Sequence, residues 1–220
     1  MQAATSGGGG RPMAGGERGT GLRERKKRET RERIANAAME LFVERGFDRT
    51  TVAEVAAAAD VSVKTVFNYF PAKEDLFFDR DEEVERLWLD AVRDRAPGEP
   101  PLAGLRRRVL ARNGDRPTGP GVAFRRVMMG SLHLQARGQQ MWTRHETAIA
   151  QGLAELWGLP EGDPTALVVA HQVLSLHPLA LRLTEEWAAA GMPAQEIDAR
   201  VRRLIDRGFD LIESGLAATG

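Results

Sequence analysis

Residues 51–70 read TVAEVAAAADVSVKTVFNYF, and this stretch decides the fold. Thr51 and Glu54 predict a capping box, in which the threonine oxygen accepts from an early backbone N–H and the glutamate reaches back, so a helix begins at Thr51. The residues DVS at 60–62 predict a tight turn whose serine can cap a second short helix over about 63–69. Two short helices joined in this way are typical of a helix-turn-helix module.

A longer amphipathic helix precedes this module and is expected over about residues 22–45. Gly46 ends it, because glycine takes the left-handed conformation at little cost. Short helices are marginal alone, so the long helix must supply packing for the pair. We therefore expect a DNA-binding domain over residues 22–73, with the helix-turn-helix at about 51–70, because the second helix of such a unit lies in the major groove. The apolar stripe of the long helix is Ile34, Ala38, Leu41 and Phe42.

The second short helix and its neighbours carry side chains suited to DNA. Lys64 is assigned to base edges or, failing that, to phosphate. Thr51, Tyr69 and Lys73 are assigned to phosphate, since phosphate contacts position a protein while base contacts specify the site. The expected DNA-binding residues are Thr51, Ser62, Val63, Lys64, Thr65, Asn68, Tyr69 and Lys73.

The run from Thr50 to Phe70, followed by KEDL at 73–76, resembles the TetR family of bacterial regulators. Gly46-Phe47 and the apolar stripe of the long helix also fit. The resemblance covers roughly the first third of the chain beyond its glycine-rich start. It implies an all-helical homodimer, usually a repressor, with a small-molecule pocket in its body and a dimer interface built from the last two helices.

Two positions depart from the family pattern. Asp60 stands where the family often has glycine, but aspartate tolerates the left-handed turn conformation better than most residues. Phe67 stands where the family often has a tyrosine that bonds phosphate. Phe67 cannot make that bond, so we expect it to pack in the core and Tyr69 to carry more of the phosphate contact.

Helical periodicity continues to the C-terminus without an alternating strand pattern. We predict an all-α protein of about nine helices, in which a helical regulatory bundle over residues 74–220 follows the DNA-binding domain. The glycine-rich residues 1–21 are expected to be a disordered tail. Pro178 is expected to kink or break its helix. The remaining helices are expected at 73–95, 102–112, 122–136 with a stop at Gly138, 139–157, 164–190 and 193–215.

Two groups of body residues are candidates for sites. Large side chains could line a ligand pocket, although residues of these types at helical spacing also fill ordinary cores. The apolar stripes of the last two helices could form a four-helix dimer interface or could cap the core of one chain. The pocket candidates are Trp88, Phe124, Met128, Leu132, Trp142, His145 and Leu174. The interface candidates are Val169, Leu176, Leu183, Val201, Leu204, Ile205 and Phe209.

The composition argues against several classes of protein. Cysteine is absent, and the four histidines show no metal-site spacing, so we expect no metal. No nucleophile–base pair or cofactor loop is found, so we expect no cofactor, no catalytic residue and no enzyme. No run of about 20 apolar residues and no signal peptide is found, so we expect a cytoplasmic protein without a membrane partner.

The charge distribution favours DNA as the partner of the first domain. The net charge of the chain is +0, yet residues 22–73 hold eleven basic and eight acidic side chains. The sequence therefore predicts a homodimeric bacterial repressor that binds a palindromic double-stranded operator and is released by an unknown small-molecule effector. A transcriptional activator and a constitutive repressor without ligand stay open, and so does a small helical enzyme. Operator position and substrate turnover would discriminate among them.

Overall fold

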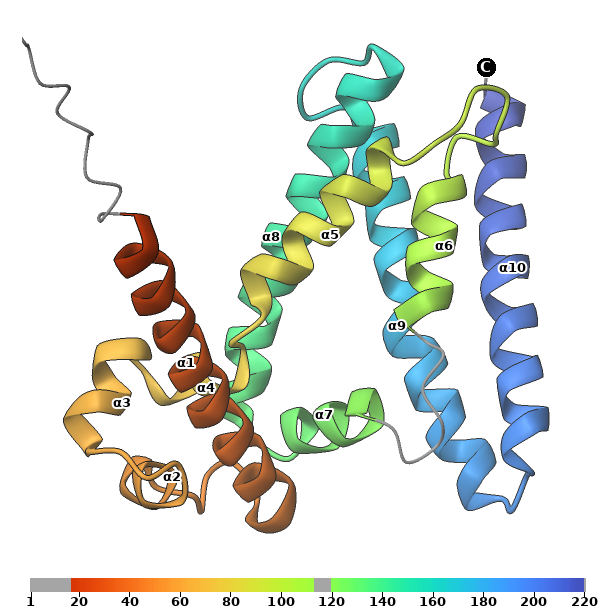
Figure 1. Ribbon diagram of the computed structural model, residues 1–220. Helices are drawn as coiled ribbons and strands as arrows, with labels where there is room; N and C mark the ends of the chain where they lie inside the picture. The colour runs from red at the N-terminus through yellow and green to blue at the C-terminus, as the bar shows by residue number, and fades with distance from the viewer. Residues whose placement is uncertain (1–16, 113–119, 220) are drawn as a thin grey trace, which may run out of the picture.

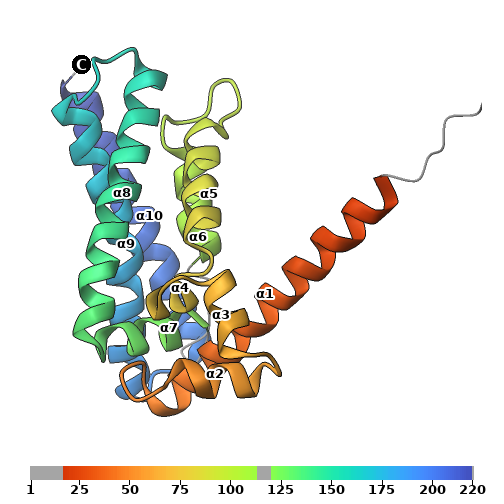
Figure 2. The same cartoon turned by 90° about the vertical axis from the view of Figure 1, so that its left-hand side faces the viewer.

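The computed structural model describes residues 17–112 and 120–219, and this part of the chain holds ten helices and no strand (Figure 1). The all-α prediction of about nine helices is confirmed. A small head of α1–α3 stands beside an upright bundle (Figure 2). The helices are α1 (Glu17–Arg45), α2 (Val52–Ala58), α3 (Val63–Tyr69), α4 (Lys73–Phe77), α5 (Asp81–Arg93), α6 (Ala103–Arg112), α7 (Pro120–Met129), α8 (Leu132–Trp157), α9 (Pro164–Ala189) and α10 (Ala194–Thr219).

The capping signals of the head are confirmed. Thr51 Oγ1 accepts from the backbone N–H of Glu54 at 3.2 Å, and Glu54 Oε2 accepts from the N–H of Thr51 at 2.7 Å. Ser62 Oγ caps α3 by accepting from the N–H of Thr65 at 3.0 Å. Asp60 takes a left-handed φ of 52°, as expected for the tight turn. These local contacts set the angle between α2 and α3.

α1 begins at Glu17, which corrects the expected tail and helix boundary. The backbone is helical from residue 17, and the good helix formers that follow from Arg23 favour the extension of the helix toward its N-terminus. Residues 1–16 of the expected tail lie outside the described residues. Arg25–Glu29 and Arg28–Glu32 ion pairs support the exposed part of α1 at helical spacing.

The single helix expected over 73–95 is two helices, so that prediction is wrong. Phe77 and Phe78 are both buried with ring centroids 5.0 Å apart, and Asp79 pairs with Arg31 of α1 at 2.6 Å. A continuous helix would point these three side chains in directions about 100° apart. The helix therefore ends at Phe77, and the turn that follows lets both rings be buried while Asp79 reaches Arg31. The acidic residues 81–83 then form the first turn of α5, where the helix dipole favours negative charge.

The helix stop expected at Gly138 is also wrong, because the boundary lies at Ser131. Ser131 Oγ accepts from the N–H of Leu134 at 3.4 Å and donates to Asp48 Oδ1 at 2.8 Å, which ties the start of α8 to the head. Gly138 is buried inside α8. A Cβ there would lie 3.2 Å from Met128 Sδ, so this glycine permits close packing and does not end the helix.

α9 runs through Pro178 without a break, so of the two outcomes expected there, a kink or a break, the break is wrong. By length and composition α9 is apolar enough to cross a membrane, contrary to the sequence expectation, and half of its most apolar window is buried inside the structure. Its place in the bundle explains this composition, since it contacts α6, α7, α8 and α10. Gly208 of α10 packs closely on α9, where a Cβ would meet Leu176 Cδ2 at 2.6 Å.

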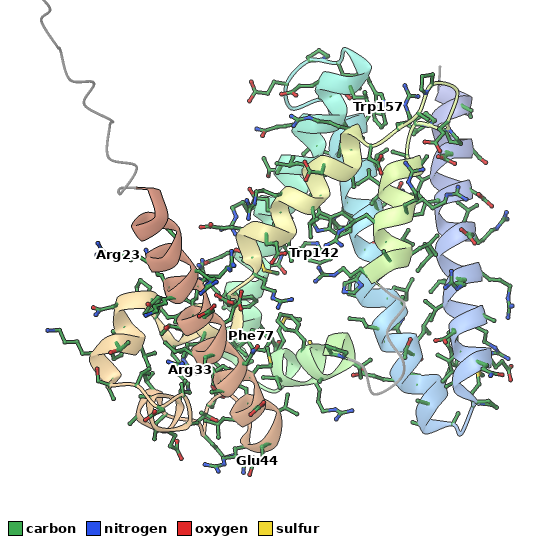
Figure 3. The ribbon with its side chains drawn as sticks, in the orientation of Figure 1. Arg23, Arg33, Glu44, Phe77, Trp142 and Trp157 are labelled. Atoms are coloured by element: carbon green, nitrogen blue, oxygen red, sulfur yellow. The ribbon has the colours of Figure 1, made fainter. Side chains whose placement is uncertain are left out.

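Two apolar clusters divide the interior. One lies under the head and continues past residue 73 to Phe77 and Phe78, with Val127 and Leu134 from the bundle. The other fills the body between α5, α6, α8, α9 and α10. Phe77 stacks on Phe124 of α7 at 4.2 Å, and Figure 3 shows Phe77 where head and body meet. The expected domain boundary at 73/74 stays a prediction.

Candidate DNA-binding interface

α3 turns one face to the core and another to solvent. Val66 and Phe70 are each 1% exposed and form the buried face. Figure 1 shows α2 and α3 at the outer edge of the head, away from α9 and α10, and Figure 2 looks at this edge. At about 100° per residue, the exposed positions occupy one continuous arc of the helix. This outer face, which we call the α3 face, consists of Val63, Lys64, Phe67 and Asn68.

The α3 face has the chemistry of a DNA-reading surface. α3 contains no acidic residue, and Lys64 gives the face a positive charge. Thr65 and Tyr69 lie half-buried at its border. Thr51 and Ser62 are exposed, but their hydroxyls already take part in the helix caps, with Thr51 Oγ1 donating to Glu54 Oε2 at 2.8 Å. The assignment of these residues to DNA stays a prediction.

Lys73 is placed differently from its sequence assignment. Its Nζ donates to the carbonyl oxygen of Phe47 at 2.6 Å and lies 4.2 Å from the centroid of the Phe47 ring. Burial lowers the pKa of Lys73, although Asp48 and Glu74 oppose this shift. Lys73 therefore joins α4 to the loop after α1, and we expect it to have a structural role in place of the phosphate contact.

Arg31 is a positioning residue that sequence reasoning missed. Its Nη1 donates to the carbonyl oxygen of Tyr69 at 3.1 Å, and its guanidinium lies 4.4 Å from the Phe70 ring centroid. Its Nε pairs with Asp79 at 2.6 Å. One side chain thus joins α1, the end of α3 and the α4–α5 turn. No spacing rule marks such a contact, because its partners lie far along the chain.

Phe67 does not pack in the core, which corrects the sequence expectation. Its side chain is 48% exposed, and its neighbour one turn earlier, Val63, is 40% exposed. The buried positions of α3 are already taken by Val66 and Phe70, so Phe67 faces outward with Lys64. The α3 face therefore has an apolar half and a polar half.

The expected ligand-pocket residues are dispersed. Trp88 and Leu174 are buried in the body cluster, with Trp142 packed against it, as Figure 3 shows for Trp142 beside α5. Phe124 and Met128 pack instead against the head cluster. Leu132 is 79% exposed at the start of α8, so it lines no interior space of a single chain. The structure does not bring these residues together.

His145 lies behind Asp81, which lines a polar cleft of about 920 Å³ between α1, the α4–α5 turn, α5 and α8. It is 2% exposed, and its Nε2 is 2.9 Å from Asp81 Oδ1. Burial lowers the pKa of His145, against the opposing effect of Asp81 and Glu85. Arg144 pairs with Asp81 and with Glu85, so α5 is fixed to α8 by charge as well as by apolar packing.

A second polar group lies inside the body. His177 of α9 is 8% exposed, and its Nε2 accepts from Arg112 Nε of α6 at 2.9 Å. Burial and the nearby positive charges of Arg112 and Arg108 hold the pKa of His177 well below its usual value. The histidine is therefore neutral and hydrogen-bonded. Arg108 lies 5.6 Å from the Trp88 ring centroid, and burial lowers its pKa.

The expected dimer residues need correction. Five of them are at most 8% exposed within one chain and present no side chain to a second copy: Val169, Leu176, Val201, Ile205 and Phe209. Leu183 and Leu204 are half-buried. Helical spacing identifies a buried stripe but does not say which chain covers it. The apolar side chains that α9 and α10 leave exposed are Leu167, Val168 and Leu211, beside a groove of about 440 Å³ that Val168 and Leu211 line.

Taken together, the head and body define a helix-turn-helix DNA-binding regulator with an all-helical body. A family model described as bacterial regulatory proteins, tetR family, matches residues 34–79. A second, described as the MftR C-terminal domain, matches residues 99–217, which is more than half of the chain. The chain belongs to the TetR family of transcriptional regulators.

Individual relatives agree with this assignment. TcmR of Streptomyces glaucescens is 38% identical over 100 residues, which cover 44% of each chain. The chain spans less than half the length of TcmR and of the next relatives, LuxR of Vibrio harveyi and RutR of Escherichia coli. MftR of Mycobacterium tuberculosis is 24% identical over 195 residues, or 87% of this chain and 93% of that one.

Solved structures share the fold. NalD, the secondary repressor of the MexAB-OprM efflux pump in Pseudomonas aeruginosa, superposes with a TM-score of 0.58 at 21% identity, covering 83% of this chain and 96% of that one. FadR of Bacillus subtilis, solved with stearoyl-CoA, gives 0.56 at 18% identity, covering 84% and 98%. At these identities the likeness is one of fold.

Proposed function

We propose that this protein is a dimeric cytoplasmic repressor that binds a palindromic DNA operator and is released by a small-molecule effector. The observation that carries the proposal is the α3 face. It lies on the outer edge of the head, carries no acidic residue and is held in place by two helix caps and Arg31. A helix presented in this way suits the major groove.

A dimer is supported by the apolar surface of α9 and α10. Leu167, Val168 and Leu211 are 38%, 54% and 57% exposed, and Val168 and Leu211 line one groove, so they form a patch of the kind that marks a protein contact. A symmetric contact would bring two helices from each chain together as a four-helix interface. The two heads would then read half-sites roughly 34–36 Å apart.

An effector in the body would act on the heads through the contacts around α4 and α5. Trp88, Trp142 and Leu174 are our candidates to contact it, since they lie in or against the body cluster next to α5. The FadR fold holds stearoyl-CoA, which supports a ligand in the same fold here. Displacement of α5 would move the Phe77–Phe124 stack and the Arg31–Asp79 pair. A coupling of about 1–3 kcal/mol would change operator affinity about 5–150-fold.

An enzyme is disfavoured, because the TetR-family relatives of this chain are transcriptional regulators. An activator with the same head would differ only in where its operator lies relative to the promoter. A constitutive repressor would have a tightly packed body without a ligand-binding cavity.

The test is fluorescence anisotropy of the purified full-length chain on DNA from its own upstream region, with random DNA as the control, across a salt series. We expect palindrome-dependent binding with two subunits per site and a lower affinity after an effector is added. If neither the upstream DNA nor sequences selected from a random pool bind more tightly than the control, the proposal is wrong.

A further inference from the structure

The outward-facing side chains of the α3 face divide into two kinds. Val63 and Phe67 are one turn apart, and both are large, apolar and at least 40% exposed. Lys64 and Asn68, also one turn apart, are polar and exposed. At about 100° per residue, Phe67 and Lys64 lie at the centre of the exposed arc, with Val63 and Asn68 on either side.

An exposed phenylalanine at the centre of such a face requires a partner of its own. No ring contact of Phe67 with another aromatic residue is found among the described residues, whereas Phe42, Phe47, Phe77 and Phe78 pack against one another in tilted or edge-to-face contacts. Its ring has no hydroxyl to bond phosphate. An exposed apolar side chain on a binding face suits a partner that places an apolar group against it.

The major groove offers one apolar group. Thymine alone places a methyl group on its floor, and phenylalanine is among the side chains that contact it, while amide and amino side chains bond the other base edges. We propose that Phe67, flanked by Val63, is a specificity-determining residue that selects thymine by its C5-methyl group. This inference rests on the proposed DNA-binding function and adds a base preference to it.

The polar half of the α3 face would determine which bases are preferred next to that thymine. Lys64 can donate to guanine O6 and N7, and Asn68 can bond adenine N6 and N7. Since Lys64 adjoins Phe67 on the arc, the methyl contact lies next to a hydrogen-bonded base pair. Each half-site is therefore expected to hold at least one thymine whose methyl group, and not its hydrogen-bonding edge alone, contributes to affinity.

The test removes single methyl groups from the DNA. Duplexes that bind the full-length protein are first selected from a random pool, and each thymine of the selected sequence is then replaced by deoxyuridine, which lacks only the C5-methyl group. At the contacted position we expect the dissociation constant to rise about fourfold for each methyl lost, as for the burial of one methyl-sized group. In Phe67→Ala this penalty should disappear, because the methyl no longer has a contact.

Val43→Ala is the matched control, since Val43 of α1 is also apolar and 50% exposed but lies outside the α3 face. It should keep the full deoxyuridine penalty. Thermal unfolding of both variants should match that of the parent chain, because neither side chain is in the core. A selected sequence that binds tightly but tolerates every deoxyuridine replacement overturns the inference, as does an equal penalty in Phe67→Ala. Failure to select any sequence would instead count against the DNA-binding function itself.

Discussion

Lys73 and Lys64 offer a direct comparison between a structural lysine and a DNA-binding lysine. In Lys73→Met, the hydrogen bond to the Phe47 carbonyl and the contact with the Phe47 ring are lost. A hydrogen bond from a charged donor contributes about 1.5–3 kcal/mol, and a partly exposed cation–π contact contributes about 0.5–1 kcal/mol. Methionine recovers part of this loss, because it removes the cost of burying the ammonium group, which is the cost that lowers the pKa of Lys73. We expect a net destabilisation of about 1–2 kcal/mol.

Thermal unfolding followed by circular dichroism measures this loss, and a chain of this size should lose about 2–8 °C. Anisotropy on DNA across a salt series supplies the second readout. In Lys73→Met the salt slope should be unchanged, since no phosphate contact is removed. In Lys64→Met the unfolding temperature should be unchanged while affinity falls, and the fall should be larger on cognate DNA than on random DNA, as for a side chain that contacts a base edge. A Lys73→Met protein with normal stability and a reduced slope would refute this reasoning and return Lys73 to the phosphate backbone.

Substitutions at three further positions test the fold and the pH dependence of its stability. Asp60→Val should lower the free energy of unfolding in urea by about 1–2 kcal/mol, because a β-branched residue resists the left-handed φ of 52° at this turn, whereas Asp60→Gly should be tolerated. Gly208→Ala should lower it by about 1–3 kcal/mol through the clash with Leu176, and an unchanged urea midpoint would mean that α9 and α10 separate freely. Burial holds the pKa of His177 well below its usual value, so below about pH 6.5 the unfolded chain binds a proton that the folded chain does not. The free energy of unfolding therefore decreases as the pH is lowered. His177→Gln should reduce that slope by up to about 1.4 kcal/mol per pH unit, and urea titrations at neutral and mildly acidic pH that stay parallel to the parent would contradict the assignment.

The parts of the fold that depend on neighbouring residues were predictable from the sequence. The capping box at Thr51 and Glu54, the serine cap of α3 and the left-handed Asp60 each involve contacts within three residues or a single backbone angle. Such contacts join residues that are close in the chain, so they can be predicted without knowledge of the tertiary fold. The exposed Lys64 follows from the same helix, because its buried face is set by Val66 and Phe70.

The errors arise where a distant contact competes with a local pattern. The helix expected to continue past Phe77 stops there because two adjacent rings are buried and Asp79 reaches Arg31. Lys73 was assigned to phosphate from its position near a helix N-terminus, because the sequence does not show that its Nζ donates to the carbonyl oxygen of Phe47. Phe67 was expected to pack because it has no hydroxyl to bond phosphate, although Val66 and Phe70 already occupy the core positions of this segment. Helical spacing also marks Ile205 and its neighbours as buried without saying that their own chain buries them.

The turn between α4 and α5 has a consequence for how the protein responds to its surroundings. A continuous helix would act as a rigid rod, whereas this junction is a joint held by ion pairs: Arg31–Asp79 on the head side, Arg137–Asp75 at 3.7 Å, and Arg144–Asp81 on the body side. Salt screens exposed ion pairs more than partly buried ones, so among these three the Arg137–Asp75 pair, whose side chains are 40% and 31% exposed, should respond most to ionic strength. We therefore expect the joint to become less stiff as the intracellular salt concentration rises, so that a smaller part of an effector's influence on α5 reaches the DNA-binding head. Osmotic conditions would then affect operator binding together with the effector.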